Sequence, residues 1–272
     1  MRSFHFVPAH QRRFLDHIPK LAADEIILEL EDGVDGRNKV LARQNMIEYL
    51  DGMHSPNVYV RTNAVDTEYW KEDKEALRCL HRHPRLIIPK VEGPATVDDV
   101  LTGMCGSTAT VSVIALIESF SALAEIKSIT QHPSVVGIGI GLEDMLSKTI
   151  HAAAEMEGLM NSIKSVVALA AKSAGVLAID TVSMEVNNMR MFRDDCQKSR
   201  SYGFDGRFTI HPRQIDEVND IYAPSPEMIA WSREMIRISG GDTMGGYRRL
   251  EGRVISGPAV KKAINILEHD KA

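Results

Sequence analysis

This 272-residue chain has few cysteines, no long apolar run and no excess of basic charge. The three cysteines, Cys79, Cys105 and Cys196, lie far apart and form no CxxC pair, so we expect reduced, mostly buried thiols. No apolar run approaches the roughly 20 residues that a transmembrane helix needs, which predicts no membrane partner. A net charge of -5 and a pI near 6.1 predict no nucleic-acid surface.

These absences favour a soluble cytoplasmic protein. Pro8 interrupts the first residues before an apolar signal-peptide core can form, which argues against a secretory leader. The composition, 44% apolar and 25% charged, is typical of a globular domain with a packed core. The length suits one α/β barrel or two small domains.

Short apolar runs rich in Ile and Val recur along the chain, and each is followed by a segment with helical spacing, such as Leu41, Met46, Ile47 and Leu50. Strict alternation of strands and helices implies a parallel sheet whose strands are buried on both faces. Eight such units favour a closed TIM (β/α)8 barrel, and an open doubly wound sheet is the alternative. The predicted strands cover residues 4–7, 26–30, 57–61, 86–90, 111–117, 135–140, 176–182 and 207–210.

The alternating pattern ends near Ile221, where a segment with two prolines follows. Beyond it we predict a helix over 227–238, a glycine-rich loop over 240–246, and a last helix from about Pro258 to residue 267. The chain therefore divides into a catalytic barrel of residues 1–222 and a C-terminal helical arm of residues 223–272. The arm acts as a lid or packs on a neighbouring subunit.

Charged or titratable residues follow six of the predicted strands. The carboxyl ends of parallel strands meet at one face of a barrel, and barrel enzymes keep their active sites there. We therefore expect these side chains to converge. They are Glu31-Asp32, Arg61, Lys90, Glu118, Glu143-Asp144 and His211.

Glu118 and Asp144 end adjacent predicted strands, so two carboxylates meet there. Such a pair suits a hard divalent cation such as Mg²⁺, with water and substrate oxygens completing its coordination. Each acid alone could instead sit favourably at the start of the helix that follows it. The presence of two more acids, Glu31 and Asp32, at the same face of the barrel favours the metal site.

The remaining charged strand ends are expected to support that site. Arg61 could bind a carboxylate bidentately or stabilise an oxyanion, and an ion pair to Glu31 or Asp32 is compatible with both roles. Neighbouring strand residues point to opposite sides, so at most one of these two acids should face the barrel axis. They would orient waters or anchor a basic residue, or form a solvated turn. Lys90 could be a Schiff-base nucleophile, but nearby acids would keep it protonated, which favours an electrostatic role.

Two further groups of residues have a structural and a functional interpretation. The glycines of segment 137–141 lack GxGxxG spacing and fall within a strand, so they predict close packing rather than dinucleotide binding. Arg12, Arg13 and His17 start the first helix on the catalytic face, where they could receive a phosphate or the pantetheine-nucleotide part of a large substrate. Solvated helix residues are an equal alternative.

Motifs spread over nearly the whole chain resemble the citrate lyase β-subunit-like branch of the HpcH/HpaI aldolase family, which includes malyl-CoA and citramalyl-CoA lyases. Each motif is weak alone, and their number and order carry the resemblance. They are Phe6-Val7-Pro8, Leu28-Glu29-Leu30-Glu31-Asp32-Gly33-Val34, Val60-Arg61-Thr62-Asn63, Ile88-Pro89-Lys90-Val91-Glu92, Ala115-Leu116-Ile117-Glu118-Ser119, Gly141-Leu142-Glu143-Asp144, Ala178-Ile179-Asp180, Gly203-Phe204-Asp205-Gly206, Ile210-His211-Pro212-Arg213-Gln214-Ile215 and Ser225-Pro226-Glu227.

The resemblance implies a TIM barrel, a Mg²⁺ cofactor held by Glu118 and Asp144, and Arg61 as a catalytic, substrate-binding residue. It also implies that a 3-hydroxyacyl thioester resembling citramalyl-CoA, malyl-CoA or citryl-CoA is cleaved to an acetyl thioester and a 2-oxo acid. The thioester carrier would be CoA or an acyl carrier protein. Homotrimers or hexamers with exchanged C-terminal arms are implied as well. Candidate substrate contacts beside Arg61 and Glu118 are Phe6, Pro8, Arg13 and His17.

One departure concerns proton transfer. Many relatives carry an acid/base Asp in a C-terminal Val-Asp-Xaa-Pro segment, and here the aligned position is Ser256, a poor base without a partner. Ala9 and His10 also replace the Gly-Asp usual after Phe-Val-Pro. Either His10, Glu31 or a water held by the metal takes the role, or the activity differs. The alternatives are a malyl-CoA-type thioesterase, a free 2-oxo acid aldolase, and a non-catalytic substrate-binding subunit.

Overall fold

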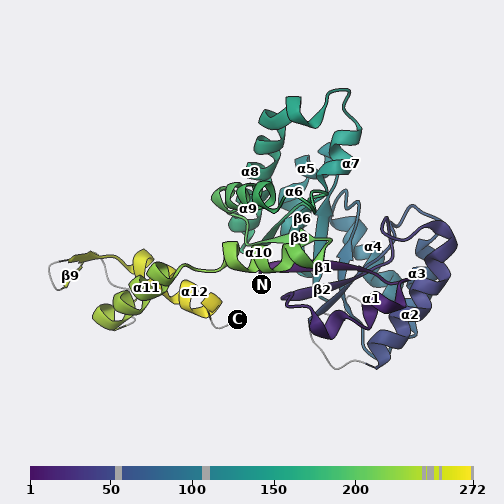
Figure 1. Cartoon of the computed structure of the whole chain (residues 1–272), viewed down its shortest axis with the longest axis horizontal. Coiled ribbons are helices and arrows are strands. Elements are labelled where there is room, and N and C mark those ends of the chain that lie inside the picture. The colour runs from purple at the N-terminus through teal and green to yellow at the C-terminus, as the bar shows by residue number, and fades with distance from the viewer. Residues whose placement is uncertain (53–56, 106–110, 241–242, 244–247, 251–252, 271–272) are drawn as a thin grey trace. The chain divides into compact units, whose positions relative to one another are not determined.

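The computed structural model describes the chain except residues 53–56, 106–110, 241–242, 244–247, 251–252 and 271–272. The chain forms two compact units (Figure 1), one of residues 2–221 and one of residues 222–272 together with Met1. Packing of the second unit on a neighbouring subunit stays a prediction.

The first unit contains a closed barrel of eight parallel strands, paired in chain order from β1 to β8 and closed by β8 against β1. This confirms the TIM barrel. Each predicted strand is present, with ends that differ from the prediction by no more than two residues. The strands are β1 Ser3–Pro8, β2 Glu25–Glu29, β3 Val58–Arg61, β4 Arg85–Ile88, β5 Val113–Ile117, β6 Val135–Ile140, β7 Leu177–Asp180 and β8 Gly206–Thr209.

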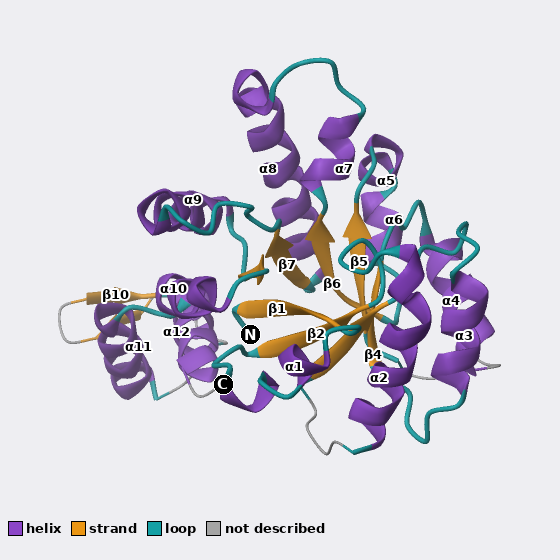
Figure 2. Cartoon of the chain, turned by 45° about the vertical axis from the view of Figure 1, so that its right-hand side comes forward, coloured by secondary structure: helices purple, strands orange, loops and turns teal. Residues whose placement is uncertain are grey.

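Helices surround the strands on the outside of the barrel (Figure 2). The longest, α8, ends at Gly175, whose positive φ of 73° provides the left-handed residue that commonly terminates a helix. The helices of this unit are α1 Arg12–Leu15, α2 Lys39–Asp51, α3 Trp70–Arg78, α4 Pro94–Cys105, α5 Phe120–Ala124, α6 Ile126–Thr130, α7 Leu142–Ser147, α8 Glu157–Ala174, α9 Met189–Tyr202 and α10 Pro212–Tyr222, with short 3-10 turns at Ile18–Lys20, Gly36–Asn38 and Ala153–Met156.

Large apolar side chains from the strands form one buried cluster of the barrel. A Cβ atom on Gly139 of β6 would lie 2.5 Å from the ring of Phe208, so glycine at this position makes room for the aromatic side chain. The glycines of β6 therefore serve close packing, as the sequence predicted. The cluster comprises Phe4, Phe6, Ile27, Tyr59, Ile87, Ile114, Leu116, Ile179 and Phe208.

Helix α2 differs from the expectation. The predicted helix is present, but Leu41, taken as part of its apolar spacing, is exposed. The buried face instead includes Lys39, Arg43 and Asn45. Polar contacts to loops at the carboxyl ends of the strands, rather than apolar packing alone, explain this choice of face.

The second unit contains α11 Pro226–Ser239, the two-stranded antiparallel sheet of β9 Arg248–Leu250 and β10 Arg253–Ile255, and α12 Gly257–Asp270. The two helices were predicted and the sheet was not. Pro258 lies in the first turn of α12, as expected, and most of the predicted 240–246 loop lies outside the described residues. A small core of its own includes Met235, Ile255, Val260 and Ala263.

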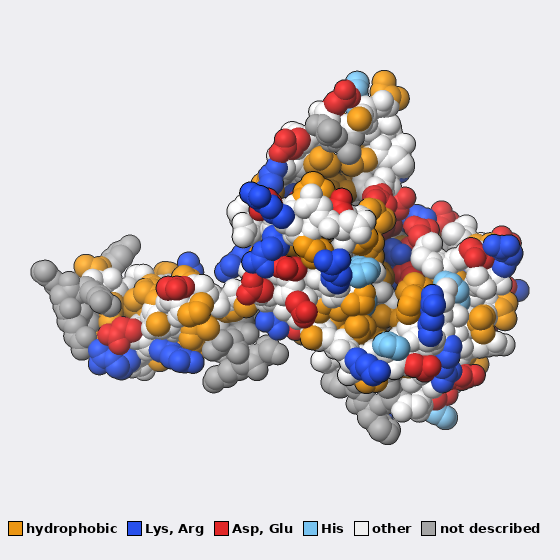
Figure 3. All heavy atoms as spheres, in the orientation of Figure 1, with side chains coloured by type: hydrophobic (Ala, Val, Ile, Leu, Met, Phe, Trp, Pro, Cys, Tyr) orange, Lys and Arg blue, Asp and Glu red, His pale blue; other side chains and the backbone are white. Residues whose placement is uncertain are grey.

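None of the described helices combines the length and the apolarity needed to cross a membrane. On the face seen in Figure 3, basic side chains are interspersed with acidic ones. Cys196 is buried as expected, whereas Cys79 is exposed, because it follows the last turn of α3 on the outside of the barrel.

Candidate functional site

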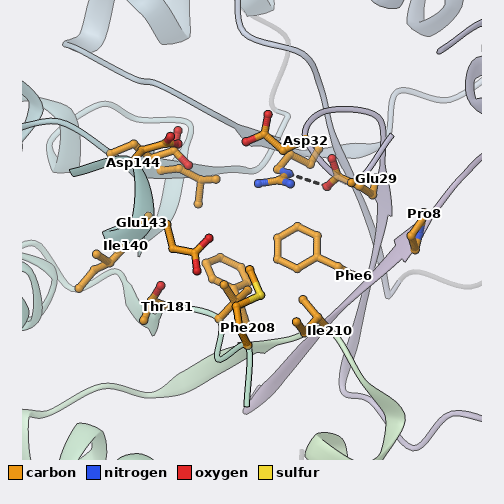
Figure 4. Close-up of a pocket in the computed structure, with 17 residues that line it drawn as sticks. Phe6, Pro8, Glu29, Asp32, Ile140, Glu143, Asp144, Thr181, Phe208 and Ile210 are labelled. Atoms are coloured by element: carbon orange, nitrogen blue, oxygen red, sulfur yellow. Dashed lines mark hydrogen bonds and ion pairs between the residues drawn. The ribbon is translucent and has the colours of Figure 1, made fainter. Parts of the chain in front are cut away.

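A cavity of about 380 Å³ opens at the carboxyl ends of the strands (Figure 4). Its walls combine apolar side chains, such as Phe6 and Phe208, with several carboxylates and the guanidinium of Arg61. Of the predicted site residues, the cavity is lined by Phe6, Pro8, Asp32, Arg61, Glu118 and Asp144.

Arg61, the last residue of β3, is held by two buried carboxylates. Its Nε donates to Glu29 Oε2 at 2.5 Å, and its Nη1 lies 3.3 Å from Glu31 Oε2. The guanidinium also lies over the ring of Phe6, 4.6 Å from its centroid. Burial alone would lower the pKa of Arg61, but Glu29 and Glu31 outweigh it and raise the pKa. The side chain therefore stays charged in a fixed orientation.

Glu118, directly after β5, is fixed by its neighbours. Its Oε2 accepts the backbone N–H of Lys90 at 2.9 Å. A Cβ on Gly141 would lie 2.5 Å from Glu118 Cγ, so glycine is required for this packing. The helix-capping alternative does not hold for Glu118, because Ser119 caps α5 by accepting the N–H of Ala122.

The backbone of Lys90 explains part of this arrangement. Its φ of 51° makes it the one non-glycine residue with positive φ in the described part of the chain. Such a conformation is costly for a residue with a side chain and is often found at functional sites. Here it belongs to the residue whose N–H contacts the Glu118 carboxylate.

Asp144 lies in the first turn of α7 and lines the same cavity as Glu118. Burial, with a contribution from Asp144, raises the pKa of Glu118 to about 7, against the opposing effect of Arg61. Burial penalises the charged form of this carboxyl group, and a bound cation would relieve that penalty. Oxygen donors of this type fit Mg²⁺. Among the described residues no group of three or more acidic, His or Cys side chains is placed to hold a metal ion, so water and substrate would complete the coordination.

Glu31 joins Arg61 to Lys90, whose Nζ lies 3.3 Å from Glu31 Oε1. Burial lowers the pKa of Lys90, but Glu31 and Asp32 outweigh it and raise the pKa, so a Schiff-base role does not fit. Burial also raises the pKa of Glu31 to about 8. Of Glu31 and Asp32, Asp32 lines the cavity and Glu31 does not, but strand alternation is not the reason, because β2 ends at Glu29.

With this geometry in place, comparisons with known proteins decide the family. The model of the HpcH/HpaI aldolase/citrate lyase family matches residues 2–212. The chain belongs to this family. Family membership supports an enzyme of the lyase or aldolase type, as the sequence motifs predicted.

Individual proteins similar to this chain are consistent with the family assignment. A (3S)-malyl-CoA thioesterase of Cereibacter sphaeroides is 30% identical over 239 residues, which cover 86% of this chain and 81% of the relative. The citrate lyase subunit beta of Escherichia coli is 28% identical over 280 residues, covering 98% and 92%. The crystal structure of CitE from Mycobacterium tuberculosis with magnesium, acetoacetate and coenzyme A superposes with a TM-score of 0.78 at 28% identity, covering 100% and 98%.

Two polar residues that line the cavity, Glu29 and Thr181, were missed by the sequence analysis. Glu29, the partner of Arg61, could have been found because it is the single acid within the predicted strand of residues 26–30. The side chain of Glu143 points into the cavity beside the ring of Phe208 (Figure 4), and Thr181 lies on the same wall. Among the described residues the cavity is lined by five acids, Glu29, Asp32, Glu118, Glu143 and Asp144, and by one basic residue, Arg61, and this composition suits a bound cation.

Arg13 and His17 do not line the cavity. Both are exposed, with His17 Nδ1 lying 3.0 Å from the carbonyl oxygen of Arg13 and the Arg13 guanidinium over the ring of Phe14. Their contact with a CoA portion stays a prediction. His10 does not line the cavity either.

Ser256, at the position where many HpcH/HpaI relatives were expected to carry Asp, belongs to the second unit. Its Oγ accepts the backbone N–H of Ala259 at 3.3 Å, so the hydroxyl caps α12. Asp serves this capping position equally well. The serine therefore cannot be explained by the needs of the helix.

Proposed function

We propose that this chain is a Mg²⁺-dependent carbon–carbon lyase that cleaves a 3-hydroxyacyl thioester, such as citramalyl-CoA, malyl-CoA or citryl-CoA, to an acetyl thioester and a 2-oxo acid. One observation carries the proposal: Arg61, anchored by Glu29 and Glu31, shares a cavity with Glu118 and Asp144. Family membership and the printed names of relatives support it.

Glu118 and Asp144 are the residues that would hold magnesium. When bound, the metal would supply Lewis-acid polarisation of the oxygens of the 2-oxo acid fragment. The role of the protein is to fix its two carboxylates, which the Lys90 N–H and the close contact with Gly141 achieve for Glu118.

Arg61 provides the fixed positive charge of the reaction. Its Nε and Nη1 are engaged by Glu29 and Glu31, and no described residue bonds its Nη2, which is available to a substrate oxygen. In the cleavage, a general base takes the proton of the 3-hydroxyl, the carbon that bears this hydroxyl becomes the carbonyl carbon of the 2-oxo acid, and its bond to C2 breaks. The electron pair goes to C2 of the thioester enolate, which then takes up a proton to give the acetyl group. Arg61 stabilises the negative charge that develops.

The test is incubation of the purified protein with citramalyl-CoA, malyl-CoA and citryl-CoA in the presence of Mg²⁺, with detection of the released 2-oxo acid. We expect release from at least one substrate, abolished by a chelator and restored by Mg²⁺. Failure with all three, while Mg²⁺ binding is intact by calorimetry, would contradict the proposal.

A thioesterase is the second candidate, favoured by the 30% identical (3S)-malyl-CoA thioesterase and by Ser256 at the expected acid/base position. Product analysis separates the two reactions. Hydrolysis yields free CoA and the intact hydroxy acid, whereas cleavage yields acetyl-CoA and the 2-oxo acid. Substrate binding without either product would instead favour a non-catalytic subunit.

We also propose that the barrel assembles as a homotrimer or hexamer in which the second unit contacts a neighbouring copy. Light scattering coupled to size-exclusion chromatography measures the molar mass. A mass equal to that of one chain, 30.2 kDa, would contradict this part of the proposal.

A further inference from the structure

A buried lysine of α2 contacts the end of β2 from outside the cavity. Lys39 is 6% exposed, and its Nζ donates to three acceptors: the carbonyl oxygens of Leu30 at 2.6 Å and Glu31 at 2.7 Å, and Asn63 Oδ1 at 2.6 Å. The ammonium also lies 5.1 Å from the ring centroid of Tyr69. None of these groups was expected from the sequence to interact with a lysine.

These contacts satisfy the ammonium completely. A lysine ammonium has three N–H donors, and burying it is costly unless each donor finds an acceptor. Here all three are used, and two of the acceptors are consecutive carbonyl groups at the point where the chain leaves β2. For stability alone, an apolar residue would suffice on this face of α2. The lysine is therefore better explained by its hydrogen bonds to the turn after β2.

The turn held by Lys39 carries Glu31, one of the two acids that orient Arg61. The Glu31 side chain reaches both Arg61 and Lys90, while its carbonyl group is bound by Lys39 on the other side of the chain.

The third acceptor extends the contact to β3. Asn63, two residues after Arg61, is itself fixed because its backbone and side-chain N–H groups both donate to Asp73 Oδ2 at 2.7 Å. Asp73 is in turn paired with Arg43 of α2. Lys39 thus joins the ends of β2 and β3, which carry the two halves of the Arg61 ion pair.

We propose that Lys39 is a positioning residue, which holds the turn after β2 and the segment after β3 so that Glu31 orients Arg61 toward the substrate. This inference rests on the proposed function for its kinetic consequence. Its structural consequence, the fixed backbone at residues 30–31, does not depend on that function.

The experiment compares Lys39→Met with Lys164→Met. Lys164 is a matched control because it is 7% exposed and pairs with the buried Asp180 at 2.9 Å, yet it contacts neither β2 nor β3. Both variants remove a buried ammonium, so both should lower the melting temperature. Only Lys39→Met should lower kcat/KM, by about a hundredfold, because small displacements of catalytic groups have effects of this size.

Two further measurements separate positioning from general damage. Mg²⁺ affinity should be unchanged in Lys39→Met, because Glu118 is held by Lys90 and Gly141 instead. Hydrogen exchange of the backbone over residues 29–35 should accelerate in Lys39→Met and not in Lys164→Met. In Lys39→Arg, the guanidinium keeps the charge but donates in a planar fork. The kcat/KM of this variant should therefore be about tenfold higher than that of Lys39→Met.

The outcomes distinguish this inference from the proposed function. If the wild-type protein cleaves none of the thioesters, the proposed function fails, and faster exchange over residues 29–35 in Lys39→Met alone still supports the role of Lys39. A folded Lys39→Met protein with wild-type exchange in this turn would overturn the inference. Equal losses of kcat/KM in Lys39→Met and Lys164→Met would overturn it as well.

Discussion

Replacing Arg61 with methionine should reduce both the stability and the activity of this protein, for separate reasons. The variant removes the cation that faces Glu29 and Glu31, which are 1% and 4% exposed. Methionine retains apolar contact with Phe6 but cannot donate a hydrogen bond. Two buried carboxylates therefore lose their partner.

The size of the stability loss follows from this burial. Removing one partner of a buried ion pair costs about 3–5 kcal/mol, because the remaining charge stays away from water. Burial already raises the pKa of Glu31 to about 8, so below that pH this side chain can become neutral by binding a proton. The loss should therefore be larger at pH 9 than at pH 6, since a carboxyl group with a raised pKa in the folded state loses its stabilising proton as the pH rises.

Activity should fall by about 10²–10³ in kcat, the usual effect of losing one group that stabilises a developing oxyanion. The double variant Glu29→Gln/Arg61→Met separates the two effects. Glutamine removes one buried charge and its side-chain oxygen can still accept the Glu31 N–H, a bond of 2.5 Å in the native protein. Urea unfolding should show stability partly restored, while the rate of thioester cleavage stays low.

Two results would refute this reasoning. If Arg61→Met is as stable as the native protein at pH 9, the ion pair contributes nothing to the fold. If the double variant recovers activity together with stability, Arg61 acts only through the fold and not on the substrate.

Three other predictions concern the metal and the missing base. Mg²⁺ affinity measured by calorimetry should be constant above about pH 7 and weaken by up to about tenfold per pH unit below it. The reason is that Glu118, with a pKa of about 7, must lose its proton to bind the metal. An affinity that does not change down to pH 5 would exclude Glu118 as a ligand. Gly141→Ala should weaken Mg²⁺ binding about 10–100-fold, since the new Cβ displaces Glu118, whereas Gly158→Ala, which meets nothing within 4 Å, should not. Ser256→Asp should raise the lyase rate at unchanged stability, because Asp keeps the α12 cap and adds a base; an unchanged rate would indicate that another group takes the proton.

Much of the fold was predictable because its signals are local. Each strand of the barrel is a short run of β-branched and other apolar residues, and such runs are recognisable in the sequence one at a time. Alternation with helices then leaves few arrangements other than a parallel barrel. The same logic placed Arg61 and Glu118 at strand ends, where the structure has them lining one cavity.

Features that depend on partners distant in the sequence were not predicted. Glu29 ends β2, and its burial there is explained by Arg61, which is 32 positions away in the chain. The buried polar face of α2 has the same origin, since Lys39 and Arg43 are explained only by Leu30, Glu31 and Asp73. An amphipathic pattern predicts a helix but does not show which polar residues will be buried.

The sequence by itself determined the eight strands and helices, their parallel order, and the face of the barrel at which charged residues meet. These follow from residue periodicity and chain connectivity, which are properties of the chain taken a few residues at a time. Only the tertiary structure decided which charges pair, which carboxylates have raised pKa values, and how the left-handed backbone at Lys90 contacts Glu118. The physical reason is that ion pairing and desolvation depend on distances between strand ends far apart in the sequence, and closure of the barrel sets those distances.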